Sequence, residues 1–117
     1  MNSECCTEKQ HNLAIIEEEL EKAKTDIEVE TSKVAYFESI IISANNLRKL
    51  TETKIIQTES RKLDLLSNKL DSQIQSISEL VRKAEIKRDE AITKVIDAEV
   101  SLIVLENKIL HSKLTNF

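Results

Sequence analysis

The 117-residue sequence contains no glycine and no proline. An average chain of this length would contain roughly fourteen of these two residues. Glycine supplies the positive backbone angles of tight turns and helix C-caps, and proline supplies rigid turns and helix breaks. Their joint absence excludes a fold rich in β-hairpins and short loops, and it favours long uninterrupted helices.

Aromatic residues are also scarce, because the chain has only Tyr36, Phe37 and Phe117. A globular core or a ligand pocket usually uses several bulky rings. We therefore expect a thin aliphatic seam in place of a broad core. We expect no small-molecule substrate and no cofactor.

Strong charge of one sign and long apolar runs are missing as well. The net charge is −4, and no block of lysine or arginine could neutralise a run of phosphates, so nucleic acid is not an expected partner. The longest apolar runs, such as Leu102–Leu105, are far shorter than the roughly 20 residues of a membrane helix. The first residues lack the basic-then-apolar order of a signal peptide, which predicts an intracellular location, cytoplasmic or cytoskeleton-associated.

A first row of apolar residues has the three-four spacing of a coiled-coil seam. Only Glu30 interrupts it, either fixing register or lying at the edge of the seam. Upstream, Thr7 and Gln10 have the spacing of a capping box, which predicts a helix from about Glu8 and a disordered segment over 1–7. The apolar members of this row are Leu13, Ile16, Leu20, Ala23, Ile27, Val34, Phe37, Ile41 and Ala44.

A second row follows in the other half of the chain. It comprises Leu63, Leu66, Leu70, Ile77, Leu80, Ala84, Ala91, Val95, Ala98, Leu102, Leu105 and Ile109. The larger apolar residues of both rows are the predicted partner-binding residues. The apolar surface is broader than one seam needs around Tyr36, Phe37 and residues 40–42, where a partner helix is expected to dock. The same broadening recurs at Ile92, Val95, Ile96, Val100 and residues 102–105, where a foreign partner and a buried face within a self-assembled bundle are equally expected.

The two rows are out of heptad register, because Leu13 and Leu63 are 50 residues apart. This predicts a turn or register break between 45 and 60, and Asn45-Asn46 is suited to a turn because asparagine tolerates the left-handed conformation. Residues 1–44 carry ten acids and four bases (−6), and residues 45–117 carry eleven acids and thirteen bases (+2). An antiparallel arrangement would set these unlike charges side by side.

The predicted fold is therefore all-α, with long helices that form a coiled-coil-like antiparallel hairpin. Residues 8–117 are expected to make a single helical unit. A continuous coiled-coil rod and a three-helix bundle are the alternatives.

Residues that could carry chemistry are few. Cys5 and Cys6 precede the predicted helix, where the helix dipole could activate or favour acylation of a thiol. The simpler interpretation is two reduced terminal thiols, because adjacent cysteines close a disulfide only with strain and zinc usually takes four spaced ligands. His11 and His111 are the only imidazoles, and no phosphate-binding loop or His-Glu-x-x-His pattern is present. We expect no catalytic, metal-binding or cofactor-binding residues, and no enzyme.

The run from Leu70 to Gln75 resembles the central glutamine layer of SNARE helices. Gln73 is flanked there by Leu66, Leu70, Ile77 and Leu80. The SNARE pattern would continue with apolar layers, but Lys87 and Lys94 fall on them and no membrane anchor follows. A SNARE-like helix is thus a weaker functional hypothesis than the two that follow.

The leading hypothesis is a non-enzymatic coiled-coil subunit that scaffolds, spaces or tethers within a larger assembly. Its partners would be other helical proteins or further copies of itself. The alternative is a small helical chaperone or cofactor, prefoldin-like or tubulin-cofactor-like, that binds a client protein.

Overall fold

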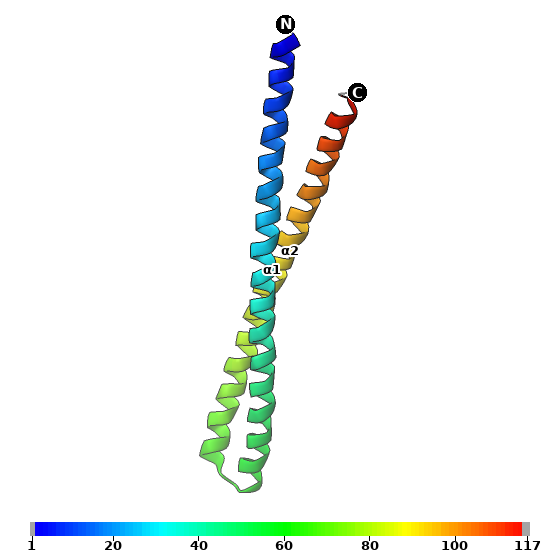
Figure 1. Cartoon of the computed structure of the whole chain (residues 1–117). Coiled ribbons are helices and arrows are strands. Elements are labelled where there is room, and N and C mark those ends of the chain that lie inside the picture. Colours follow the sequence, from blue (N-terminus) through cyan, green and yellow to red (C-terminus); the bar gives the residue numbers. More distant parts are fainter. Residues whose placement is uncertain (1, 116–117) are drawn as a thin grey trace. The chain divides into compact units, whose positions relative to one another are not determined.

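The computed structural model consists of two long helices joined by a short turn (Figure 1). It describes residues 2–115, with side chains from residue 10 onward. Helix α1 spans Asn2–Ser60 and α2 spans Asp64–Thr115. The predicted antiparallel helical hairpin is confirmed, and the described residues form neither a continuous rod nor three helices. The backbone of α1 is helical from Asn2, within the segment 1–7 for which the sequence predicted disorder.

The turn is a helix C-cap of the Schellman type. Lys62 has a left-handed backbone with a φ of 57°. The amide of Leu63 donates to the carbonyl of Thr58 at 2.8 Å, and the amide of Lys62 donates to the carbonyl of Glu59 at 3.0 Å. These two bonds satisfy carbonyls that the end of α1 would otherwise leave unpaired. Helix α2 begins at once, because the amide of Ser67 donates to the carbonyl of Leu63 at 2.9 Å.

The predicted position of the turn, at Asn45-Asn46 or elsewhere in 45–60, was wrong. This whole segment lies within α1, and the turn follows it at residues 61–63. The side chain of Asn45 instead accepts a hydrogen bond from the guanidinium of Arg48 at 2.8 Å, within the same helix. Asparagine can stay in a helix when its side chain has such a local partner.

Each helix buries one unbroken heptad row, which we call its inner row. Every member is buried or half-buried. The α1 inner row contains Leu13, Ile16, Leu20, Ala23, Ile27, Glu30, Val34, Phe37, Ile41, Ala44, Arg48, Thr51, Ile55 and Thr58. The α2 inner row contains Ser67, Leu70, Ile74, Ile77, Val81, Ala84, Arg88, Ala91, Val95, Ala98, Leu102, Leu105, Ile109 and Ser112.

The inner row of α1 therefore continues past Ala44 without the predicted register break. Polar residues occupy it there, and Thr51 remains buried because its hydroxyl donates to the carbonyl of Leu47 at 2.8 Å. A row that passes through Arg48 and Thr51 is invisible to a search for apolar residues. This is why the sequence pattern seemed to end at Ala44.

The second predicted row was wrong at three positions, and its other members lie in the α2 inner row. Leu63, Leu66 and Leu80 are exposed, and the inner row passes through Ser67, Ile74 and Val81. Ser67 and Arg88 interrupt the hydrophobic pattern of the true row, and leucines stand beside this row at positions 66 and 80. From Ala91 onward the predicted and observed rows agree.

The chain divides into two compact units. Unit 2, residues 33–90, contains the turn and the adjoining parts of both helices. Its core is a cluster of Ile41, Ala44, Ile77, Val81 and Ala84, against which the half-buried Ile40 packs. Alanine in this cluster lets the two backbones approach closely.

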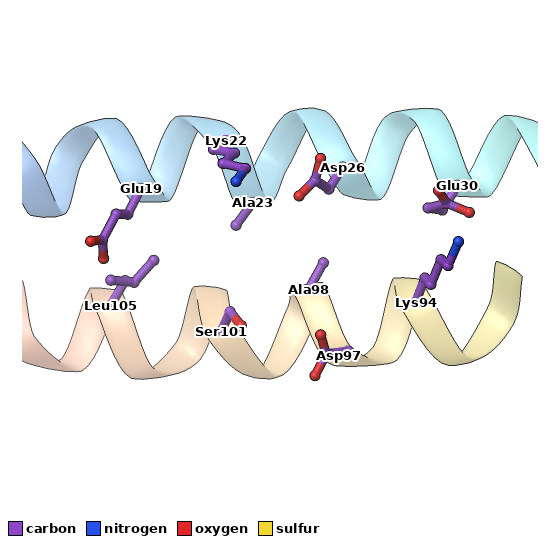
Figure 2. Close-up of a pocket in the computed structure, with 10 residues that line it drawn as sticks. All are labelled: Glu19, Lys22, Ala23, Asp26, Glu30, Lys94, Asp97, Ala98, Ser101 and Leu105. Atoms are coloured by element: carbon purple, nitrogen blue, oxygen red, sulfur yellow. The ribbon is translucent and has the colours of Figure 1, made fainter. Parts of the chain in front are cut away.

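Unit 1 combines residues 1–32 of α1 with residues 91–117 of α2. Its buried apolar residues are Ala23, Ala91, Ala98 and Leu105. The two segments are antiparallel, because Glu19 lies level with Leu105 and Glu30 with Lys94 (Figure 2).

Candidate functional site

An open cavity of about 400 Å³, lined mostly by polar and charged residues, lies between the two helix segments of unit 1 (Figure 2). Ala23, Ala98 and Ser101 leave the gap because their side chains are short. Figure 2 shows Glu30 and Lys94 on facing helices pointing toward each other. The cavity is lined by Glu19, Lys22, Ala23, Asp26, Glu30, Lys94, Asp97, Ala98, Ser101 and Leu105.

The chemistry of this cavity is limited by solvent. Glu19, Asp26 and Asp97 are all exposed. Paired carboxylates perform acid and base catalysis only where a water-poor environment moves their pKa values apart. No group of three or more metal-ligating side chains occurs in the described part of the chain. The cavity is therefore a solvated gap in the helix pairing, and it supplies no argument for catalysis.

The predicted partner-binding residues are largely used inside the chain. All of them except Leu63, Leu66 and Leu80 lie in the inner rows, where they are buried or half-buried. The inner rows of one chain thus cover each other in the hairpin. A surface for another protein has to be sought among the exposed apolar residues.

A first such surface runs along α1 in unit 2. Tyr36, Ile40, Ser43, Leu47 and Leu50 follow one another at four and three residues, and we call them the α1 outer row. Tyr36, Leu47 and Leu50 are between 51% and 62% exposed. Each member directly precedes a member of the inner row, so at 100° per residue this row lies about 100° around the helix from it. Tyr36 also makes an edge-on ring contact with Phe37, with ring centroids 5.5 Å apart.

A second surface runs along α2 in unit 1. Its residues again alternate at four and three, and its five apolar members are between 53% and 72% exposed. Counting 100° per residue, the row lies roughly 150° from the inner row. This α2 outer row consists of Ile96, Val100, Ile103, Asn107, Leu110 and Leu114.

Only parts of these outer rows were predicted from the sequence. Tyr36, Ile40, Ile96, Val100 and Ile103 were predicted as extra apolar surface, whereas Leu47, Leu50, Leu110 and Leu114 were not. The signal was present, because the same three-four spacing recurs in a second phase of each helix. Recognising it requires knowing which phase the hairpin itself buries.

A third apolar surface lies at the tip of unit 2. Leu65 is 87% exposed, and Leu63 and Leu66 beside it are also exposed. A shallow cavity at this tip is lined by Lys62, Leu63, Asp64, Leu65 and Leu66. Three neighbouring leucines in water are costly enough that they suggest a binding role.

The other residues singled out from the sequence are either exposed or lie outside the described residues. Gln73 is exposed, and Ile74 takes the inner-row position beside it, so the SNARE-like glutamine does not lie in the helix seam. His11 and His111 are exposed. The side chains of Cys5, Cys6 and Thr7 lie outside the described residues. No helix in the described part of the chain has the length and apolarity to cross a membrane.

Comparison of the chain with protein-family models, with curated proteins and with solved structures gave no match.

Proposed function

We propose that this chain is a non-enzymatic coiled-coil interaction subunit that scaffolds, spaces or tethers within a larger assembly. The observation that supports this is the pair of outer rows. A two-helix hairpin needs one apolar row on each helix, and this chain has a second row on each, exposed throughout on α2 and at all positions but Ile40 on α1. Heptad spacing is the pattern that another helix recognises, because it presents apolar side chains along one line of the helix surface.

The outer rows differ from scattered surface hydrophobics, which are normal and need no explanation. Ile42 and Ile56 are scattered in this sense, being 62% and 67% exposed but in neither row. The two kinds of position have similar exposure and similar chemistry. Variants at Ile42 and Ile56 can therefore serve as matched controls for variants in the outer rows.

The test is affinity purification of tagged variants from the native source, with quantitative mass spectrometry. Leu47→Ser with Leu50→Ser changes the α1 outer row, and Ile103→Ser with Leu110→Ser changes the α2 outer row. We expect each variant to lose at least one stoichiometric partner, including further copies of the chain, because burial of these side chains drives helix association. Helicity measured by circular dichroism should stay unchanged.

The control is Ile42→Ser with Ile56→Ser, which should retain every partner. If the wild-type chain recovers no stoichiometric partner, or if neither outer-row variant loses one, the proposed function is wrong.

The exposed tip supports a second candidate, the small helical chaperone. Client-binding hairpins need apolar residues at their ends, and Leu63, Leu65 and Leu66 meet this requirement. A light-scattering assay of an aggregating client decides between the two functions. Suppression that disappears in Leu65→Ser with Leu66→Ser, but persists in the outer-row variants, would favour the chaperone.

A further inference from the structure

The α2 outer row has a feature that the α1 outer row lacks, namely an amide in its middle. Asn107 lies between Ile103 and Leu110, with apolar residues continuing on both sides. In heptad terms Val100, Asn107 and Leu114 take the a positions, and Ile96, Ile103 and Leu110 take the d positions, because three residues separate each a from the next d. A single asparagine at an a position is a known device for fixing the register and number of strands.

We propose that the α2 outer row forms a parallel two-stranded coiled coil with a second copy of this chain. This inference rests on the proposed function and names one partner for it. In a parallel pair, equivalent a positions meet, so Asn107 faces Asn107 of the second copy. The asparagine amide has both donors and acceptors, so two such side chains satisfy each other. Against an apolar side chain the same amide would be buried without a partner, which is costly.

The charges beside the row permit this pairing. Parallel strands bring each g position next to the e position five residues further along the partner. Glu106 then meets His111 of the second copy, and Glu99 meets Val104. No pair of like charges results. In an antiparallel pair that overlaps the whole row, Glu99 would meet Lys113, Glu106 would meet Glu106 of the second copy, and Asn107 would face Ile103. That orientation is disfavoured because it leaves the amide of Asn107 without a polar partner.

The remaining structure is compatible with the pairing. The α2 outer row lies roughly 150° around the helix from the inner row, so a second copy can approach without displacing the α1 segment of unit 1. All five apolar side chains of the row are already solvent-exposed on a formed helix. Binding therefore does not have to pay for folding the recognition helix.

Self-association is tested on the purified full-length chain by sedimentation equilibrium up to concentrations on the order of 100 µM. We expect a monomer–dimer equilibrium. Ile103→Asp places a charge in the centre of the row and should weaken dimerisation by about tenfold or more. Ile56→Asp is the control, because Ile56 is equally exposed but lies outside both outer rows, and it should leave the equilibrium unchanged.

Orientation is tested by disulfide formation in a background carrying Cys5→Ser and Cys6→Ser. Asn107→Cys should form an interchain disulfide readily, because a parallel pair brings the two positions together. Lys108→Cys, one residue further around the helix, should form it much more slowly. A wild-type chain that stays monomeric, or equal rates for the two cysteine variants, would overturn the proposal. The outer row would then be left to a helix of another protein, and the proposed function would still stand on its own test.

Discussion

Lys62 shows how a chain without glycine can still turn. Its left-handed φ of 57° is a conformation that costs an L-residue with a Cβ roughly 1–2 kcal/mol. The surrounding hydrogen bonds from Leu63 to Thr58 and from Lys62 to Glu59 hold it in place. The turn lies at Lys62 although asparagine is the better residue for the left-handed conformation. The pairing of the two helices, and not the local preference of Asn45 or Lys62, therefore decides where the chain turns.

Replacing Lys62 with glycine should stabilise the hairpin. The steric cost of the left-handed backbone is removed, and part of the gain is lost because glycine is more flexible in the unfolded chain. We expect the free energy of unfolding to rise by about 0.5 to 1 kcal/mol, measured by urea denaturation followed by circular dichroism. Arg61→Gly is the control and should lower stability, because the left-handed residue is Lys62. Loss of stability in Lys62→Gly would contradict the turn geometry.

At the scale of the helices, the register is set by matching large residues with small ones. In the core of unit 2, isoleucine and valine from either helix pack in one cluster with alanine: Ile41, Ala44, Ile77, Val81 and Ala84. Folding the chain about residues 61–63 places Ala44 opposite Val81 and Ile41 opposite Ala84. Side chains of complementary size fill the space between the two helices, which is the usual requirement of a packed interior.

Exchanging one such pair should reveal the register. Ala44→Val overfills the cluster, and Val81→Ala leaves a cavity, so each single change should destabilise the hairpin by about 1–2 kcal/mol. The double variant moves the bulk across the interface, and we expect it to be more stable than the sum of the single effects by about 1 kcal/mol or more. Chemical denaturation of the four proteins gives this coupling energy.

The comparison for this cycle is Ala44→Val combined with Val95→Ala, a pair from different units whose effects should add. A coupling between Ala44 and Val81 no larger than that of the comparison pair would mean that the register is wrong.

How much of each inner row could be predicted from the sequence depends on the residue types that occupy it. The α1 inner row was recognised from Leu13 to Ala44 because nine of its members there are apolar. Its continuation through Arg48 and Thr51 was missed, since threonine there is satisfied by a backbone carbonyl and arginine can bury its aliphatic stem. In α2, Leu66 was predicted in place of its neighbour Ser67 and Leu80 in place of Val81, because leucine is strongly hydrophobic, but Ser67 and Val81 are the buried residues. Hydrophobicity alone does not distinguish a row used by the hairpin from one left for a partner.

For the molecule as a whole, burial of the inner rows accounts for the hairpin better than charge does. The ion pairs Lys24–Glu21 and Lys83–Glu79, at 3.5 and 3.3 Å, each lie within one helix and are well exposed. Such pairs contribute at most about 1 kcal/mol. The charge asymmetry between residues 1–44 and 45–117 led to the correct prediction of an antiparallel arrangement. The turn itself lies at residues 61–63, within the second range and not at the boundary between the two.

Lysine crosslinking with mass spectrometry checks the topology of the chain in solution. Lys54 and Lys69 lie eight and seven residues from Lys62 on opposite helices, and Lys22 and Lys94 line the same cavity of unit 1. We expect Lys54–Lys69 and Lys22–Lys94 links within one chain. A turn at Asn45-Asn46 would instead link Lys22 with Lys69, which lies 25 residues, or roughly 38 Å, from Lys94 along α2.

Mixing light and isotopically heavy chains separates links within a chain from links between copies. Lys69→Arg should abolish the Lys54–Lys69 link and leave the Lys22–Lys94 link. An abundant Lys22–Lys69 link within single chains would contradict the turn at residues 61–63, whereas links between copies confined to lysines near the α2 outer row, such as Lys108 and Lys113, would agree with pairing through that row.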